Sequence, residues 1–399
     1  MSQKLPPQPS YAPLGLYLHL PYCKTKCTYC SFVSGSPRSE AEIDRYLDAL
    51  IVHLRSGAYL VEGREITTVF LGGGTPSLMG PERLAKLFQA VHDAYQISST
   101  AEITIEANPE SATRELFMRL RPLGLNRVSL GVQSFHDDEL QWLGRVHSVD
   151  GVYRAVDAVR AADIDNLSLD LIFGLPNQSE ERWAQSVERA LGCGMDHFSS
   201  YALSYEQGTL LDRLLQQNKV TPADDERYES MYIALRERMA QAGFEHYELS
   251  NWAKPGKRCE HNCIYWRRDD YLAFGVSAHG WINGLRYGLV RDPNRYVDLI
   301  ESAKGGEINL PFGGGLLDEQ QTLSSDEAAS DAMIFGLRLS RGVDVARFES
   351  RYGYPPERRW GEAMQKLQAR GLIDFDSEKI WLTPNAYFIS NEALVYFVD

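Results

Sequence analysis

Short apolar runs alternate with amphipathic stretches along the first half of the chain. The apolar runs are short and predict six strands, at 15–20, 66–71, 102–106, 127–131, 166–171 and 197–201. The stretches between them repeat apolar residues at helical spacing and predict helices at 40–54, 81–94, 113–120, 151–162 and 179–191. Strands and helices in strict alternation predict an α/β fold with a parallel sheet and helices outside it.

The alternation weakens after residue 201. A helix is predicted at 224–242, an aromatic-rich region follows at 244–281, and a glycine-rich segment lies at 304–315. Further helices are predicted at 326–339, 343–352 and 359–370, followed by a hairpin of 372–375 and 380–382. This pattern favours four parts: a flexible tail (1–13), a core (14–300), a linker (301–325) and a small winged-helix-like α+β domain (326–399).

Composition and charge exclude several classes of protein. The 399 residues suffice for one large and one small domain. A net charge of -13 argues against general binding to nucleic acid or anionic membranes, which needs a basic face. The C-terminal module mixes Arg358, Arg359 and Lys366 with Glu357 and Glu362, so we expect a lid or partner surface there and not a DNA-binding one. Without a membrane-length apolar run or a signal-peptide pattern, the chain is expected to be cytoplasmic.

Three of the six cysteines, Cys23, Cys27 and Cys30, lie within eight residues, directly after the first predicted strand. Thiolates at this spacing need a thiophilic metal, either zinc or an iron-sulfur cluster. Structural zinc usually takes four protein ligands, and no second Cys or His pair with the right spacing follows. A four-iron cluster held by three thiolates keeps one iron open for another ligand. The other cysteines, Cys193, Cys259 and Cys263, are expected to be free thiols.

The Cys-x3-Cys-x2-Cys spacing, with Tyr29 just before the last cysteine, resembles the signature of the radical S-adenosylmethionine (SAM) superfamily. The resemblance implies a partial (β/α)6 barrel of the TIM type and a [4Fe-4S] cluster ligated by Cys23, Cys27 and Cys30. It also implies that SAM chelates the open iron. Electron transfer from the reduced cluster then cleaves a carbon-sulfur bond of SAM and releases a 5'-deoxyadenosyl radical.

Polar or flexible residues recur where the predicted strands end, which is the rim where parallel barrels collect functional groups. The cysteines follow the first strand, Gly72-Gly73-Gly74-Thr75-Pro76 follows the second, and Glu106 ends the third. The glycines let a ligand approach the backbone, and neither Gly-Lys-Ser/Thr nor Gly-x-Gly-x-x-Gly is present to indicate a nucleotide-phosphate loop.

The surrounding motifs resemble the HemN-like group of that superfamily, which also carries a C-terminal domain of the predicted kind. The resemblance implies a set of SAM-binding residues: Tyr17, Gly73, Gly74, Thr75, Glu106, Gln133, Arg145, Asp170 and Ala202. Their chemistry suits a zwitterionic nucleoside, because carboxylates bind an amine or ribose hydroxyls and a guanidinium binds a carboxylate.

Two subgroups of the HemN-like group compete. Oxygen-independent coproporphyrinogen III oxidase has a fourth cysteine two positions after the third and a longer N-terminal extension, whereas this chain has Phe32 and 22 residues before Cys23. The heme-chaperone subgroup has Phe at that position and a His-Asn-x-x-Tyr-Trp motif, which matches 261–266.

The heme-chaperone resemblance implies heme contact through His261, Tyr265 and Trp266, since an imidazole beside aromatic walls suits a porphyrin. Cys259 and Cys263 offer thiolate ligation instead, or a zinc site with His261. The implied function is delivery of heme to acceptor proteins, respiratory enzymes among them, with a flavodoxin or ferredoxin as electron donor. The alternatives are the oxidase and a SAM-dependent modification enzyme for another substrate.

Overall fold

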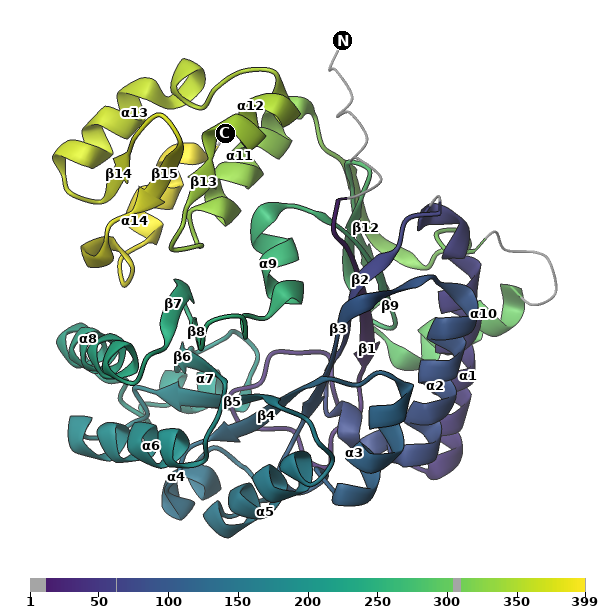
Figure 1. Cartoon of the computed structure of the whole chain (residues 1–399). Coiled ribbons are helices and arrows are strands. Elements are labelled where there is room, and N and C mark those ends of the chain that lie inside the picture. Colours follow the sequence, from purple (N-terminus) through teal and green to yellow (C-terminus); the bar gives the residue numbers. More distant parts are fainter. Residues whose placement is uncertain (1–11, 62, 304–309, 399) are drawn as a thin grey trace.

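The computed structural model describes residues 12–61, 63–303 and 310–398. One large curved sheet carries helices on its outer face, and a smaller C-terminal domain lies over its open side (Figure 1). The predicted tail 1–13 falls mostly outside the described residues. The glycine-rich 304–309 lies outside them altogether.

Twelve strands form the large sheet, in the order β12-β11-β10-β9-β1-β2-β3-β4-β5-β6-β8-β7. The six predicted strands are β1 (Leu14–Leu20), β2 (Ile66–Gly73), β3 (Ile97–Ala107), β4 (Arg127–Gln133), β5 (Asn166–Phe173) and β6 (His197–Ala202), all parallel to their neighbours in this run. The strands beyond them are β7 (Glu245–Glu248), β8 (Asn251–Ala253), β9 (Asp270–Phe274), β10 (His279–Ile282), β11 (Leu285–Leu289) and β12 (Leu317–Thr322). Within the described residues the two edge strands, β12 and β7, do not pair with each other, so the barrel is open.

Amphipathic helices cover the outer face of the parallel strands. They and the shorter connecting helices are α1 (Glu40–Ser56), α2 (Pro81–Ala94), α3 (Arg114–Leu120), α4 (Asp137–Trp142), α5 (Val149–Arg160), α6 (Glu180–Gly192), α7 (Leu210–Gln216), α8 (Asp225–Gln241), α9 (Glu260–Arg267) and α10 (Pro293–Ala303). Several of them start at Ser, Thr or Asp caps; Ser39 accepts a hydrogen bond from the amide of Glu42, for example. Their apolar faces pack on strand residues such as Leu16, Leu18 and Ile105.

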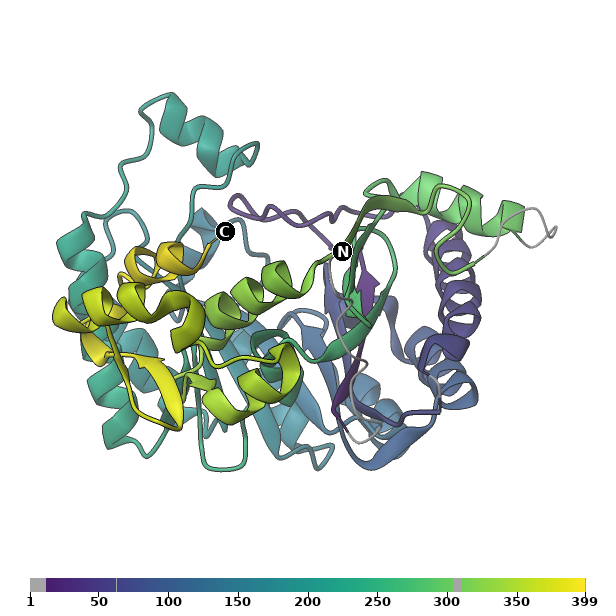
Figure 2. The same cartoon turned by 90° about the horizontal axis from the view of Figure 1, so that it is seen from above.

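The parallel strands bring their carboxyl ends to one rim. Leu20 pairs with Gly73 at the ends of β1 and β2, and Phe173 pairs with Ala202 at the ends of β5 and β6. Figure 2 shows the purple loop after β1 extending along this rim toward the teal segment that contains α7, where the amide of Leu211 donates to the carbonyl of Thr28 at 2.9 Å. The predicted convergence of strand ends is therefore present.

The C-terminal domain has its own core. Its elements are α11 (Ser325–Gly336), β13 (Val343–Asp344), α12 (Val345–Tyr352), α13 (Glu357–Ala369), β14 (Ile373–Phe375), β15 (Lys379–Leu382) and α14 (Asn391–Leu394). The hairpin predicted near 372–382 is the antiparallel β14–β15 pair, and β13 adds a third strand. Met333, Phe348, Trp360 and Leu367 form a buried cluster between these elements. The domain joins the barrel through backbone hydrogen bonds, including Ser340 N to Tyr247 O at 3.0 Å.

One range differs from its prediction as a linker. Within 301–325, residues Leu317–Thr322 form β12, which pairs antiparallel with β11. Five of its six residues are exposed, and the run Asp-Glu-Gln-Gln lacks the apolar alternation that predicts a strand. Pairing with β11 overrides this weak local propensity.

Candidate functional site

The loop after β1 presents its three cysteines, all half-buried, at the rim. Backbone hydrogen bonds fix the loop: Gly74 N donates to Leu20 O and Thr75 N to Tyr22 O, both at 2.8 Å, and Cys30 N donates to Cys27 O at 3.3 Å. In the part of the chain that the structure describes, no three His, Cys, Asp or Glu side chains are grouped to hold a single metal ion. Phe32, where the oxidase subgroup has its extra cysteine, is 64% exposed.

A chain of side-chain hydrogen bonds connects two of the thiols through the ends of three strands. Thr75 Oγ1 donates to Cys23 Sγ at 3.5 Å and accepts from Asn108 Nδ2 at 3.0 Å. Asn108 Oδ1 accepts from Arg145 Nη2 at 2.5 Å, and Arg145 Nη1 donates to Cys27 Sγ at 3.2 Å. Burial raises the pKa of the Cys23 thiol, and the hydrogen bond from Thr75 opposes that effect. Donors aimed at sulfur favour thiolates, which is the state that an iron-sulfur cluster requires.

The glycines at the end of β2 form a cradle with no space for a side chain. A Cβ on Gly74 would lie 2.8 Å from both the Pro21 carbonyl carbon and the Tyr22 oxygen. A Cβ on Gly72 would lie 3.0 Å from Glu106 Oε2. Gly73 has a φ of 110°, which L side chains rarely adopt. The glycines therefore allow Glu106 and the cysteine loop to approach the backbone closely.

Two carboxylates, Glu106 and Asp170, are buried inside the barrel and interact electrostatically. Glu106 Oε2 accepts a hydrogen bond from Gly73 N at 3.0 Å, and no ion pair to Glu106 occurs among the described residues. Burial and the charge of Asp170 raise the pKa of Glu106 to about 7. Burial also raises the pKa of Asp170, while hydrogen bonds from serines oppose it; Ser129 Oγ donates to Oδ2 at 2.9 Å. Paired acids of this kind fit a cationic ligand, such as the amine or sulfonium of SAM.

Two other predicted SAM-binding residues, Gln133 and Ala202, lie at the ends of β4 and β6. Gln133 has a φ of 70° where the β4 register shifts against β5, and its Nε2 lies 3.0 Å from the position of a Cβ on Gly131. A positive φ is uncommon in residues other than glycine, and here it changes the direction of the Gln133 side chain. Ala202 is exposed at the end of β6 and has no side-chain polar group.

Tyr17 connects the barrel interior to the cysteine loop. His19 Nε2 is 3.1 Å from the Val33 carbonyl, which only accepts, so Nε2 carries the proton. His19 Nδ1 therefore accepts from the Tyr17 hydroxyl at 3.1 Å. Burial lowers the pKa of His19 to about 4, which keeps the ring neutral. This relay holds the segment beyond Cys30 against β1.

His261 lies in the first turn of α9 and points into the barrel wall. The ring has no exposed surface. Its Nδ1 lies 2.7 Å from Thr68 Oγ1 and its Nε2 lies 2.8 Å from the Tyr265 hydroxyl, so both nitrogens are occupied. It also stacks on Phe70, with ring centroids 5.1 Å apart, and burial lowers its pKa to about 3. Ligation of iron by His261 would require Thr68 or Tyr265 to release it.

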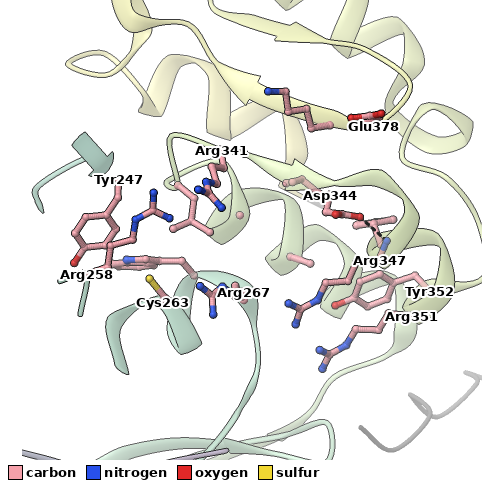
Figure 3. A pocket seen from close by; sticks show the side chains of 18 residues that line it. Tyr247, Arg258, Cys263, Arg267, Arg341, Asp344, Arg347, Arg351, Tyr352 and Glu378 are labelled. Carbon is pink, nitrogen blue, oxygen red and sulfur yellow. Dashed lines mark hydrogen bonds between the residues drawn. The ribbon is translucent and has the colours of Figure 1, made fainter. Parts of the chain in front are cut away.

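The opposite face of α9 lines a cavity of about 470 Å³ against the C-terminal domain. Cys263, Trp266 and Arg267 come from α9, and Phe348 and Tyr352 come from α12. Figure 3 shows the labelled side chains converging on this cavity from both sides. The heme motif predicted from the sequence is thereby divided: His261 and Tyr265 face the barrel, and Trp266 lines the cavity.

Comparisons with known proteins agree with this architecture. The Radical SAM superfamily matches residues 17–190, and the HemN C-terminal domain matches residues 323–389. The crystal structure of coproporphyrinogen III oxidase (HemN) from Escherichia coli superposes with a TM-score of 0.82 over 97% of this chain and 90% of that one, at 22% identity. The fold and the strand-end site define a radical SAM protein with a HemN-type C-terminal domain.

Two relatives cover nearly the whole chain. The protein named heme chaperone HemW from Mycobacterium tuberculosis is 36% identical over 95% of this chain and 93% of its own length. The protein of that name from Bacillus subtilis is 32% identical over 96% of this chain and 98% of its own length. The chain therefore belongs to the HemW family.

Membership of the radical SAM superfamily implies a [4Fe-4S] cluster and SAM. The donors present fit both groups: sulfur atoms that receive hydrogen bonds, a glycine cradle without space for a Cβ, and buried acids without a paired cation among the described residues. None of the helices described is long and apolar enough to cross a membrane.

Sequence reasoning missed several residues that shape the site. Asn108 joins Thr75 to Arg145, and Ser129 and Ser168 donate to Asp170. Asn108 lies two positions after Glu106, at the rim and before a proline, so its position after a strand end could have predicted it as a site residue. The serines lie on neighbouring strands, and only the register of β4 and β5 brings Ser129 to Asp170.

Proposed function

We propose that this protein is a heme chaperone, which binds heme and transfers it to acceptor proteins while carrying a [4Fe-4S] cluster and an exchangeable SAM. The observation that carries the proposal is the similarity over nearly the full length to proteins named heme chaperone. The His-Asn-x-x-Tyr-Trp motif on α9 and Phe32 in place of a fourth cysteine support it.

In this proposal Cys23, Cys27 and Cys30 ligate the cluster, and Thr75 and Arg145 stabilise the thiolates by donating hydrogen bonds. When bound and reduced, the cluster supplies the electron that cleaves SAM. Glu106 and Asp170 receive the cationic groups of SAM, Gly73 and Gly74 allow its methionyl part close to the backbone, and Tyr17, Gln133 and Ala202 complete the pocket. Heme binds beside α9, and respiratory enzymes are among the acceptors.

The proposed division of the chain follows the same lines. Residues 14–300 form the barrel that holds cluster and SAM, and 326–399 form the domain that covers α9. The protein acts in the cytoplasm and receives electrons from a flavodoxin or ferredoxin.

One anaerobic experiment tests the chaperone. The cluster is reconstituted, heme is titrated by absorbance, and the loaded protein is mixed with apomyoglobin as a probe acceptor. The same sample is incubated with SAM, reductant and coproporphyrinogen III. Stoichiometric heme binding and transfer without decarboxylation is the expected result. Turnover to protoporphyrinogen with only nonspecific heme binding would contradict the proposal.

The second candidate is oxygen-independent coproporphyrinogen III oxidase, favoured by the superposition on that enzyme over 97% of this chain. At 22% identity this likeness concerns the fold alone. If neither heme nor the porphyrinogen binds, the remaining candidate is a radical SAM enzyme that acts on another substrate.

A further inference from the structure

The cavity between α9 and the C-terminal domain has a charge opposite to that of the whole protein. Six basic side chains line it, against the two acids Asp344 and Glu378: Arg258, Arg267, Arg341, Arg347, Arg351 and Lys379. The chain carries a net charge of -13. A basic cavity in an acidic protein concentrates an anionic ligand.

Two of these basic groups, Arg267 and Arg341, can change partners easily, whereas Arg347 is paired with the buried Asp269. Arg267 reaches Glu260 at 3.3 Å, in a pair whose side chains are 31% and 49% exposed. Within the described part of the chain, the guanidinium of Arg341 makes no hydrogen bond or ion pair. Exposed ion pairs contribute little to stability, so a ligand carboxylate can replace such a partner at small cost. Figure 3 shows the guanidinium groups of Arg267, Arg347 and Arg351 directed toward the same part of the cavity.

The remaining walls are apolar and aromatic. Trp266 and Cys263 of α9 line the cavity together with Phe348 and Tyr352 of α12, and Tyr247 lines it as well. A volume of about 470 Å³ lies in the range of small-molecule sites. The cavity therefore combines flat hydrophobic walls with several carboxylate-binding forks. A porphyrin has this pair of properties, because an apolar macrocycle carries two propionates along one edge.

We propose that this cavity is the heme site, with the propionates bound by arginines of α9 and α12, chiefly Arg267 and Arg351, and the macrocycle between Trp266 and Phe348. The inference rests on the proposed function and adds the location. It moves heme from the His261 face of α9 to the opposite face and makes the C-terminal domain one wall of the site.

The test compares heme with heme dimethyl ester, whose propionates are neutral, on the reconstituted full-length protein. Wild type should bind heme roughly tenfold to a hundredfold more tightly than the ester, as expected for charged hydrogen bonds to carboxylates. In R267Q/R351Q this preference should fall to about twofold or less, because the two guanidinium groups proposed to bind the carboxylates are removed.

The matched control is R55Q/R119Q, which removes two exposed arginines paired with Asp93 and Glu82 on the outer helices. It should retain the wild-type preference. Cluster absorbance and thermal unfolding establish that both double variants are folded. If R267Q/R351Q does not fold, the single variants R267Q and R351Q replace it, and each should lower the preference for heme over the ester.

The outcomes separate the two claims. No specific heme binding by wild type overturns the proposed function. Tight heme binding with no preference over the ester, or an undiminished preference in R267Q/R351Q, overturns this location and leaves the chaperone intact.

Discussion

The rim of the barrel and the cavity beside α9 are built in contrasting ways. At the rim, polar groups come from the ends of consecutive parallel strands and are already joined by hydrogen bonds, as in the path Cys23, Thr75, Asn108, Arg145, Cys27. In the cavity, the basic groups come from separate elements of two domains, and Arg341 has no partner among the described residues. The side chains of the rim are therefore preorganised, whereas Arg341 in the cavity is available for a new partner.

This difference matches the tasks that we propose for the two regions. A resident cluster and SAM need fixed donors, because misplaced ligands lose affinity and allow solvent in. A transferred ligand must leave again, so exposed arginines that exchange partners are more useful than a closed network. Variants of the cysteine loop and of His261 on α9 separate the two regions, and variants of Glu106 and Gly74 probe the rim alone.

The largest effect is expected from C23A/C27A/C30A. Iron and sulfide incorporation should be lost, because no other cysteines lie on this loop. Heme affinity should change by less than about twofold, since distant sites without shared partners behave independently. Iron and sulfide analysis with a heme titration measures both, and Cys193→Ala, at the end of α6, is the control. Parallel loss of heme binding would show that the regions are not separate.

His261→Ala distinguishes the two faces of α9. The variant creates a cavity and leaves the Thr68 and Tyr265 hydroxyls without their partner, so the free energy of unfolding should fall by about 2–4 kcal/mol. Heme affinity should stay within about threefold of wild type if heme occupies the opposite face. Denaturant unfolding and heme titration provide the readouts, with the exposed His92→Ala as control. A large loss of heme affinity in a folded variant would instead support iron ligation by His261.

Glu106 makes stability depend on pH. Its pKa is about 7 in the folded protein against 4.5 ordinarily, so the folded state retains a proton that the unfolded chain has released between these values. The stabilisation is complete below about pH 4.5 and is lost as pH rises through 7, a change on the order of 3 kcal/mol.

Glu106→Gln removes this titration. Relative to wild type, the variant should therefore gain stability at pH 8 and should differ little at pH 5. Denaturant titrations at the two values test this, with the exposed Glu115→Gln on α3 as control. An unchanged pH dependence in Glu106→Gln would rule out Glu106 as the titrating group.

The smallest effect is expected from Gly74→Ala. The added methyl would meet the backbone of Pro21 and Tyr22 at 2.8 Å, so the rim must shift, at about 1–3 kcal/mol. Cluster occupancy should also fall because Gly74 anchors the cysteine loop. Gly192→Ala on α6 meets nothing within 4 Å and is the matched control. Equal stability of the two variants would show that the rim is looser than its contacts imply.

The order of strands and helices was predictable because each parallel strand carries recurring apolar residues and lies between amphipathic helices. β1 to β6 lie at the predicted places, and so does the β14–β15 hairpin. The strands β7 to β12 were not predicted. β12 shows why: its run of Asp, Glu and Gln is half of an exposed antiparallel pair, and its propensity is decided by its partner.

The rim could be inferred from strand ends alone, but the cavity could not. Arg258 and Lys379 are separated by more than a hundred positions, and only the packing of the C-terminal domain brings them to one space. The division of the His-Asn-x-x-Tyr-Trp motif was within reach, because His261 and Tyr265 are four residues apart on one helical face and Cys263 and Trp266 lie on another. Which face meets the barrel depended on Thr68 and Phe70 of β2.

The helix α9 lies between the barrel interior and the cavity, so it separates the two proposed binding sites. Its inner face contacts Phe70 and stacks near Tyr17, and its outer face lines the basic cavity. Thermodynamic linkage makes any communication across this helix reciprocal: the factor by which occupancy of the barrel changes affinity on the far side equals the factor in the reverse direction. Any coupling between the two sites would therefore pass through the eight residues of α9, Glu260–Arg267.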